Sequence, residues 1–422
     1  MLSQAWYRSH HYLNCTVFFL PLQQMSPFNF ILFACCLFES SGENILILHP
    51  IYCGSHEFVL RSLGDHLVQR GHQVTQVRFK QKNSHMELQT NVSVLTLNIS
   101  DHLNNCARYV NDKGVLDIST VGAKILWDQG HSVFGLPLDI FCLTDVHCYT
   151  LHHHPQLLHL LQTQTFDLVI IDLIGNECSI ALAKSLQVPI IGFWGFPFHG
   201  GEAAYTSVFH PPSLYPTFFS GLQMKMNFGE RFCNFLLHLF HRLYMDFQVF
   251  YANSYINQYY PQIPPLSQII HDLDLILVNT NQFVDYPRLL PPNIKQVGGL
   301  QLISDDTVSL SSGSLPKDYQ DFVSGAEEGV ILFSLGYTGF SAKDVPQSVV
   351  LALLEAFSSM KQNRFVMRFD PEVMPFTPDN VKVSKWIPQQ ALLAHPNVIA
   401  FISHCGIGSL LEAVYHSVPI GK

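Results

Sequence analysis

The stretch that decides the fold runs from Val383 to Pro419 and reads V-S-K-W-I-P-Q-Q-A-L-L-A-H-P-N-V-I-A-F-I-S-H-C-G-I-G-S-L-L-E-A-V-Y-H-S-V-P. Its centre is a short apolar run at 398–402. The turn S-H-C-G-I-G-S at 403–409 follows at once, and apolar residues at helical spacing come after it. A buried strand, a glycine turn and a helix start form half of a βαβ unit. The stretch therefore predicts an α/β domain with a parallel sheet.

The turn at 403–409 predicts a phosphate site. Backbone N–H groups at a helix N-terminus attract an anion, and the helix dipole adds to that attraction. The turn also carries the imidazole of His404, the hydroxyl of Ser409 and two glycines, Gly406 and Gly408. Glu412 follows one helical turn later, within reach of a ribose hydroxyl held beside that phosphate.

A site for a nucleobase is predicted from Trp386 and Gln389, which precede the turn. The flat indole of Trp386 can stack on a base, and the amide of Gln389 can hydrogen-bond to it. The rival interpretation is a dinucleotide fold, which needs the pattern G-x-G-x-x-G. Gly406 and Gly408 supply the first two glycines, but Leu411 stands at the third position. A nicotinamide oxidoreductase is therefore disfavoured. A G-x-G by itself is also compatible with a structural turn that binds no ligand.

Composition bounds the class of protein. The chain has 422 residues, 48% of them hydrophobic, which suits two or three domains with large cores. Only 13% of the residues are charged and the net charge is −9, which argues against nucleic acid as a partner. The ten cysteines show no C-x-x-C spacing, so neither a zinc knuckle nor a disulfide framework is predicted.

The N-terminal region predicts entry into the secretory pathway. The apolar block at 25–38 is too short to span a bilayer and suits the core of a signal peptide. A start at Met25 would make the preceding residues an upstream extension. Asn91 in N-V-S and Asn98 in N-I-S are then glycosylation acceptors. We therefore expect residues 1–42 to be a signal peptide with an upstream extension that precedes the folded chain. We expect the protein to be located in the lumen of the endoplasmic reticulum.

The first half of the chain opens with a β-α-β pattern. The apolar run at 44–49 predicts a buried parallel strand, the next helix ends at Arg70-Gly71, and 72–77 predicts a second strand. Ligands in such sheets bind beyond the carboxyl ends of the strands, which is where His56 falls. A histidine that caps the helix or faces solvent is the alternative interpretation.

A further buried strand at 166–172 ends in Asp172, at the same predicted edge as His56. A carboxylate beside a histidine can fix its tautomer and stabilise its imidazolium, as a general base requires. The alternative is that Asp172 caps the helix that starts near Glu177. The region at 85–165 is rich in histidines without metal-ligand spacing, and we predict no metal site there.

The segment at 196–259 is rich in aromatic residues. We predict that it forms a core or acceptor-pocket face rather than a membrane span, because Arg231 and Arg242 interrupt it. A shallow contact with a membrane surface stays open. The residues at helical spacing are Phe232, Phe235, Leu236, Leu239, Phe240, Leu243, Tyr244 and Phe247.

Two domains joined by a linker are predicted. The stretch at 291–328, rich in Pro, Gly and Ser, separates a first Rossmann-like domain at 43–290 from a second at 329–422. The second domain begins with a strand at 330–336 that runs into a glycine turn. The D-x-D that starts at Asp272 opens a strand instead of following one, so it is not predicted to hold a metal.

Together, the patterns Trp386-x-Pro-Gln and His404-x-Gly-x-x-Ser-x-x-Glu resemble the signature of the UDP-glycosyltransferase family, the UDP-glucuronosyltransferases and their invertebrate relatives. The resemblance implies the GT-B fold, two Rossmann-like domains facing a cleft. It implies that the first domain binds a small lipophilic acceptor and the second a UDP-sugar. A hexosyl or glucuronosyl group would be transferred with inversion, with the UDP-sugar as co-substrate and neither a metal nor another cofactor. A homo- or hetero-oligomer stays open.

The resemblance also assigns roles to single residues. His56 matches the catalytic base, and Asp172 matches its carboxylate partner. In the second domain, the family's pattern implies that the indole stacks on uracil, the glutamate holds the ribose, and the turn binds the diphosphate. The matching donor-binding positions are Gly336, Tyr337, Trp386, Gln389, His404, Gly406, Gly408, Ser409 and Glu412.

The sequence departs from the family's pattern in three places. Tyr337 stands where the family commonly has Ser, and Met367 where it commonly has Trp. The chain ends at Lys422, before the Asp-Gln pair that grips the donor sugar in relatives and before their membrane anchor. An incomplete second domain is therefore expected. The alternative function is a catalytically inactive UDP-binding or partner protein of the same fold.

Overall fold

The computed structural model describes residues 42–49, 54–79, 91–99, 142–198, 200, 203, 205–217, 220–302, 315–336 and 345–421. The predicted signal peptide and the predicted donor contact of Tyr337 lie outside these residues.

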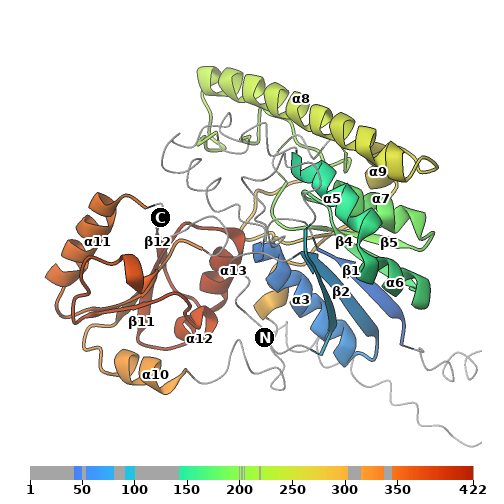
Figure 1. Cartoon of the computed structure of the whole chain (residues 1–422). Helices are drawn as coiled ribbons and strands as arrows, with labels where there is room; N and C mark the ends of the chain where they lie inside the picture. Colours follow the sequence, from blue (N-terminus) through green and yellow to red (C-terminus); the bar gives the residue numbers. More distant parts are fainter. Residues whose placement is uncertain are drawn as a thin grey trace, which may run out of the picture. The chain divides into compact units, whose positions relative to one another are not determined.

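The first sheet of the described chain has seven parallel strands in the order β3-β2-β1-β4-β5-β6-β7 (Figure 1). The strands are β1 Asn44–Leu48, β2 Gln73–Phe79, β3 Ser93–Leu97, β4 Leu168–Asp172, β5 Ile190–Trp194, β6 Leu275–Val278 and β7 Ile294–Gln296. The helices are α3 Gly54–Gln69, α5 Cys142–His153, α6 Pro155–Thr163, α7 Glu177–Ser185, α8 Phe228–Tyr259 and α9 Leu266–His271. Because β1 pairs with both β2 and β4, the strand order reverses between β1 and β4, and ligands bind at such a switch point.

The second sheet repeats this topology with five parallel strands in the order β10-β9-β8-β11-β12. The strands are β8 Val330–Ser334, β9 Arg364–Arg368, β10 Val381–Ser384, β11 Val398–Ser403 and β12 Ile420–Gly421. The helices are α10 Lys317–Ser324, α11 Gln347–Ser359, α12 Gln389–Leu393 and α13 Ile407–Tyr415. Its switch point lies between β8 and β11, which pair in parallel. Two doubly wound parallel sheets flanked by helices confirm the predicted fold class.

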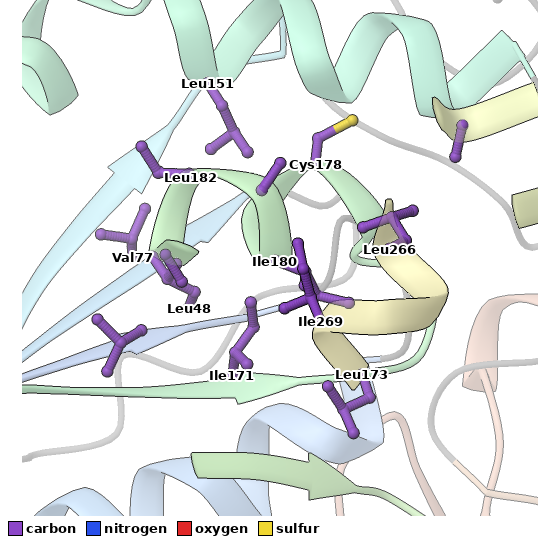
Figure 2. Close-up of a cluster of buried hydrophobic side chains, with 14 of the residues drawn as sticks. Leu48, Val77, Leu151, Ile171, Leu173, Cys178, Ile180, Leu182, Leu266 and Ile269 are labelled. Carbon is purple, nitrogen blue, oxygen red and sulfur yellow. The ribbon is translucent and has the colours of Figure 1, made fainter. Parts of the chain in front are cut away.

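The cores explain why these segments form three layers. Along β1, Ile45 and Ile47 pack toward α3, whereas Leu46 and Leu48 pack toward the opposite face, where α5, α7 and α9 lie. Figure 2 shows this second cluster, with side chains from strands and from the covering helices meeting in one layer. Both faces are thus buried, as the continuous apolar strands predict. Each fully buried aliphatic side chain contributes about 1.5–3 kcal/mol.

The predicted linker contains ordered elements of both domains. Residues 294–296 form β7, which pairs with β6 at the edge of the first sheet. The 3-10 turn η6, Leu300–Leu302, follows it. Farther on, α10 buries Tyr319 and Val323 in the core of the second sheet. Proline and glycine content therefore did not exclude a strand and a helix within the predicted linker.

The aromatic face predicted to be a core or acceptor-pocket face is exposed on α8, so it is not part of the core. Phe232, Phe235, Leu243 and Phe247 are each half exposed or more. Helical spacing shows that residues share a face, but it does not show which face meets the protein. Although α8 is 32 residues long, no helix among the described residues has the length and apolar character needed to cross a membrane.

A disulfide joins Cys148 on α5 to Cys178 on α7. The cysteine spacing, from which no disulfide framework was predicted, did not reveal this pair. The two residues are 30 positions apart in sequence, and they meet because both helices pack on the same face of the first sheet. No local cysteine spacing encodes that contact.

Candidate functional site

His56 and Asp172 meet at the switch point of the first sheet. Asp172 is the last residue of β4 and is fully buried, and His56 lies in the first turn of α3. The distance from His56 Nδ1 to Asp172 Oδ2 is 2.6 Å, and the backbone N–H of Ile174 donates to Asp172 Oδ1 at 2.9 Å. Both carboxylate oxygens therefore have partners, and the second ring nitrogen of His56, Nε2, is left to act on a ligand.

Gly195, directly after β5, makes room for the His56 ring. A Cβ on Gly195 would lie 2.2 Å from His56 Cε1 and 2.4 Å from Nε2, which no real side chain could tolerate. The amide of Asn279, at the end of β6, donates to the Gly195 carbonyl at 3.1 Å and holds this segment in place. Sequence analysis missed Gly195, although a glycine that directly follows the apolar run at 189–194 was an available signal.

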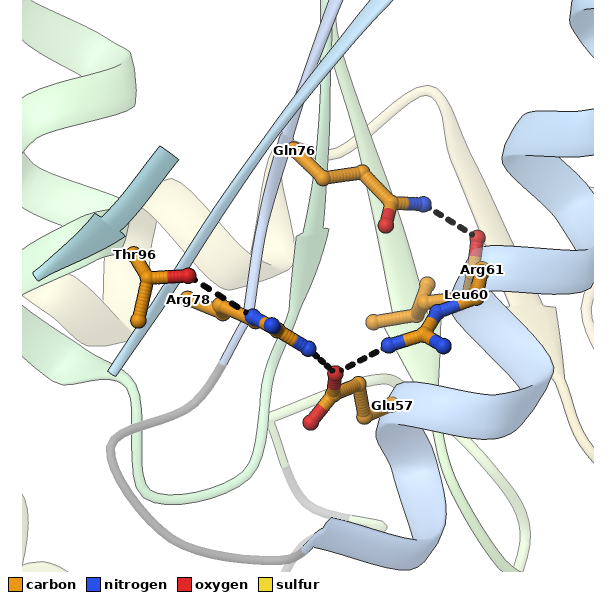
Figure 3. Close-up of polar contacts among 6 residues, drawn as sticks. All are labelled: Glu57, Leu60, Arg61, Gln76, Arg78 and Thr96. Atoms are coloured by element: carbon orange, nitrogen blue, oxygen red, sulfur yellow. Dashed lines mark hydrogen bonds and ion pairs between the residues drawn. The ribbon is translucent and has the colours of Figure 1, made fainter. Parts of the chain in front are cut away.

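The residue after His56 fixes helix α3 on the sheet (Figure 3). Glu57 Oε1 accepts from Arg61 Nη2 at 2.6 Å and from Arg78 Nη1 at 2.5 Å, so one carboxylate bridges α3 and β2. Arg78 Nε also donates to Thr96 Oγ1 at 2.9 Å on β3.

At the end of β1, burial lowers the pKa of His49 to about 4, so this imidazole is neutral at pH 7. Neither His49 nor the residues that contact Glu57 were singled out from the sequence.

The predicted phosphate turn lies at the switch point of the second sheet. Gly406 is the N-cap of α13, and Gly408 is in its first turn. The ring of His404 fits against two glycines: a Cβ on Gly336 would lie 2.5 Å from His404 Cε1, and one on Gly406 would lie 2.5 Å from Nε2. Gly336 also has a φ of +87°, which favours glycine. Burial and the nearby Arg368 lower the pKa of His404, which keeps it neutral.

Three predicted donor residues form one hydrogen-bonded group. Gln389 Nε2 donates to Glu412 Oε2 at 2.6 Å and lies 3.4 Å from Ser409 Oγ. Burial raises the pKa of Glu412 to about 7. A carboxyl so placed beside the turn can exchange its proton near neutral pH, and it can accept from a hydroxyl when ionised.

The raised pKa of Glu412 gives a prediction for stability. A carboxyl whose pKa is about 7 in the folded chain and about 4.5 when unfolded binds its proton more tightly in the folded state. The free energy of unfolding should therefore fall by about 3 kcal/mol as pH rises from 4.5 to 7. Glu412→Gln should remove this part of the pH dependence in thermal melts. If the melting temperature of the variant depends on pH in the same way as that of the wild type, the raised pKa of Glu412 is not the source of this pH dependence.

Trp386 follows β10 and is 44% exposed. Its ring stacks with that of Phe58 on α3, with 6.4 Å between centroids and 19° between planes. The guanidinium of Arg368 lies 5.8 Å from the Trp386 centroid and donates to the Gly336 carbonyl. The indole therefore contacts both the helix that carries His56 and the rim of the second sheet. Sequence analysis named Trp386 but missed Phe58 and Arg368 as its neighbours.

The described residues show no arrangement typical of a metal centre. Within them, no group of three or more His, Cys, Asp or Glu side chains is placed to hold a metal ion. Asp272 is the C-cap of α9 and Asp274 precedes β6, so the D-x-D lies at the amino end of that strand. That end is opposite to the edge where His56 and Asp172 meet.

Comparisons with known proteins show which family the chain is similar to. The family model described as "UDP-glucoronosyl and UDP-glucosyl transferase" matches residues 45–421. The chain is 30% identical to UDP-glucosyltransferase 2 of Dactylopius coccus, across 92% of this chain and 71% of that protein. It is 28% identical to UDP-glucuronosyltransferase 2B1 of Rattus norvegicus, across 95% of this chain and 74% of that protein.

Solved structures share the fold at lower sequence identity. A UDP-glucose: anthocyanidin 3-O-glucosyltransferase in complex with UDP superimposes with a TM-score of 0.54 at 15% identity, over 90% of this chain and 80% of that chain. The calicheamicin glycosyltransferase CalG4 gives a TM-score of 0.51 at 17% identity, over 90% and 79%. Both are similar to this chain in its two-sheet architecture.

Proposed function

Because the chain belongs to the UDP-glucoronosyl and UDP-glucosyl transferase family, we propose that it transfers a hexosyl or glucuronosyl group from a UDP-sugar to a small lipophilic acceptor. The observation that carries the proposal is the pairing of two switch points. One holds the His56–Asp172 contact, and the other holds the N-terminus of α13. The indole of Trp386 is exposed and lies next to Arg368, whose guanidinium donates to the Gly336 carbonyl.

In the proposed reaction, His56 is the general base. Asp172 holds Nδ1, so Nε2 takes the proton of an acceptor hydroxyl, and the carboxylate stabilises the imidazolium that forms. The acceptor oxygen bonds to the anomeric carbon as the bond from that carbon to the UDP oxygen breaks. Attack from the face opposite UDP inverts the anomeric configuration.

The proposed donor site lies on the second sheet and needs no metal. The leaving diphosphate gains negative charge. The N-terminus of α13 stabilises this charge, and the imidazole of His404 would donate a hydrogen bond to the diphosphate. Trp386 would stack on uracil, and Glu412 would accept from the ribose. The complete proposed set is Gly336, Tyr337, Trp386, Gln389, His404, Gly406, Gly408, Ser409 and Glu412.

Calorimetric titration with UDP tests this proposal. The wild-type chain should bind UDP, and Trp386→Ala should weaken binding about 10-fold to 100-fold, because base stacking on an aromatic ring contributes roughly 1–3 kcal/mol. An affinity for UDP that does not change in Trp386→Ala would refute the donor site. Binding of UDP without transfer to any acceptor would instead support the alternative, an inactive UDP-binding or partner protein.

We also propose that the chain resides in the secretory lumen. The Cys148–Cys178 disulfide supports an oxidising compartment. Asn91 and Asn98, the predicted glycosylation acceptors, are both exposed at the two ends of β3. Endoglycosidase treatment of the protein from secretory cells should lower its mass, and the Asn91→Gln/Asn98→Gln double variant should show no such change. An unmodified wild-type chain would contradict this location.

A further inference from the structure

Gln301, in the 3-10 turn η6, places a side-chain amide beside the proposed donor site. Neither Nε2 nor Oε1 has a hydrogen-bond partner, and both atoms are buried. Nε2 lies 3.9 Å from the position that a Cβ would take on Gly408. The amide therefore approaches the first turn of α13 on the side where Gly408 has no side chain.

The backbone of η6 is held from two directions. Ser62 Oγ on α3 donates to the Leu300 carbonyl at 2.8 Å, and Gln390 Nε2 on α12 donates to the Gln301 carbonyl at 3.2 Å. The turn is thus tied to the helix that carries His56 and to the helix that starts at Gln389. A side chain on such a fixed turn is pre-organised, so it loses little freedom when a ligand arrives.

An unpaired buried amide needs a physical reason. Most buried polar side-chain atoms in proteins have a partner, and an unmade hydrogen bond costs stability. The side-chain amide of Gln301 has an NH2 group that can donate hydrogen bonds and a carbonyl oxygen that can accept them. A ligand that docks at the N-terminus of α13 with an anionic oxygen next to a hydroxyl would satisfy both. A nucleoside diphosphate carries these groups on its diphosphate and its ribose.

We propose that Gln301 is a donor-binding residue supplied by the segment between the two sheets, with Nε2 donating to the diphosphate and Oε1 accepting from a ribose hydroxyl. The inference rests on the proposed function, because it takes UDP as the ligand of the same helix N-terminus. It adds a contact from outside the second sheet, on a turn bonded to the helix of the proposed base.

The test compares UDP affinity with the stability of the ligand-free chain. Gln301→Leu should weaken UDP binding about 10-fold in calorimetry, while the melting temperature without UDP stays the same or rises, because an unsatisfied amide is removed. Gln301→Glu should weaken binding further and make it more salt-dependent, because a carboxylate then faces the diphosphate. Gln320→Leu, which removes an exposed amide on α10, is the matched control and should leave UDP affinity unchanged.

The opposite pattern would overturn the inference. If Gln301→Leu lowers the melting temperature and leaves UDP affinity unchanged, the amide has a purely structural role. Trp386→Ala, titrated in parallel, separates this failure from that of the proposed function. If the wild-type chain does not bind UDP, both proposals are refuted. If UDP affinity falls in Trp386→Ala but not in Gln301→Leu, only the inference about Gln301 is refuted.

Discussion

Transfer by the His56→Ala variant should be slower than wild type by about 10²–10⁴-fold, the usual contribution of a general base. The imidazole is held by Asp172 at 2.6 Å, and alanine leaves no group that could take the acceptor proton. UDP affinity should stay unchanged, because the proposed donor site lies on the other sheet. The measurement is the rate of glycosyl transfer from UDP-sugar at saturating donor, alongside calorimetry with UDP.

Two further variants sharpen this result. Asp172→Asn should also slow transfer, and the His56→Ala/Asp172→Asn double variant should be no slower than His56→Ala, because the two groups act as a unit. His159→Ala, which removes an exposed histidine on α6, is the matched control. Transfer at the wild-type rate in His56→Ala would remove the imidazole from the mechanism.

Gly195→Ala should lower the rate of transfer at least 100-fold although it adds one methyl group. That methyl would lie 2.2 Å from His56 Cε1, so either the ring rotates out of its contact with Asp172 or the segment after β5 shifts. A displacement of about 1 Å in a catalytic group can cost about 10²-fold in rate. Steady-state kinetics should show the loss in kcat, with UDP affinity intact.

Gly229→Ala, in the first turn of α8, is the control for this substitution. A Cβ there would meet only Asn227 Oδ1, at 3.5 Å, which is ordinary contact. Wild-type kcat is expected for that variant. If Gly195→Ala also retained wild-type kcat, the close approach of this segment to the His56 ring would have no bearing on the reaction.

Local pattern predicted the elements that carry the site. The apolar runs that became β1 and β4 are buried on both faces, and parallel strands bring their carboxyl ends to one edge. For this reason His56 and Asp172 could be expected near each other, although 116 positions separate them. In the structure Gly336 and His404 also meet, because each follows one strand of the β8–β11 pair.

Local pattern was misleading where packing decides. The aromatic residues of α8 share a helical face, yet Phe232 and Phe247 are exposed, because the buried contacts of α8 come from other positions such as Asn234 and Ala252. The Cys148–Cys178 disulfide likewise depends on α5 lying against α7. Each outcome is set by which surfaces meet after the sheet has formed.

By itself, the sequence determined the buried strands β1, β2, β4, β8 and β11, the two carboxyl edges that they form and the helix N-terminus at Gly406, because each follows from residues close together in the chain. Only the tertiary structure decided that Gly195 lies against His56, that Glu57 bridges Arg61 and Arg78, and that Gln301 reaches the turn near Gly408. These contacts join segments from different strands and helices. Their distances depend on how those elements pack, and no periodicity along the chain encodes a packing distance.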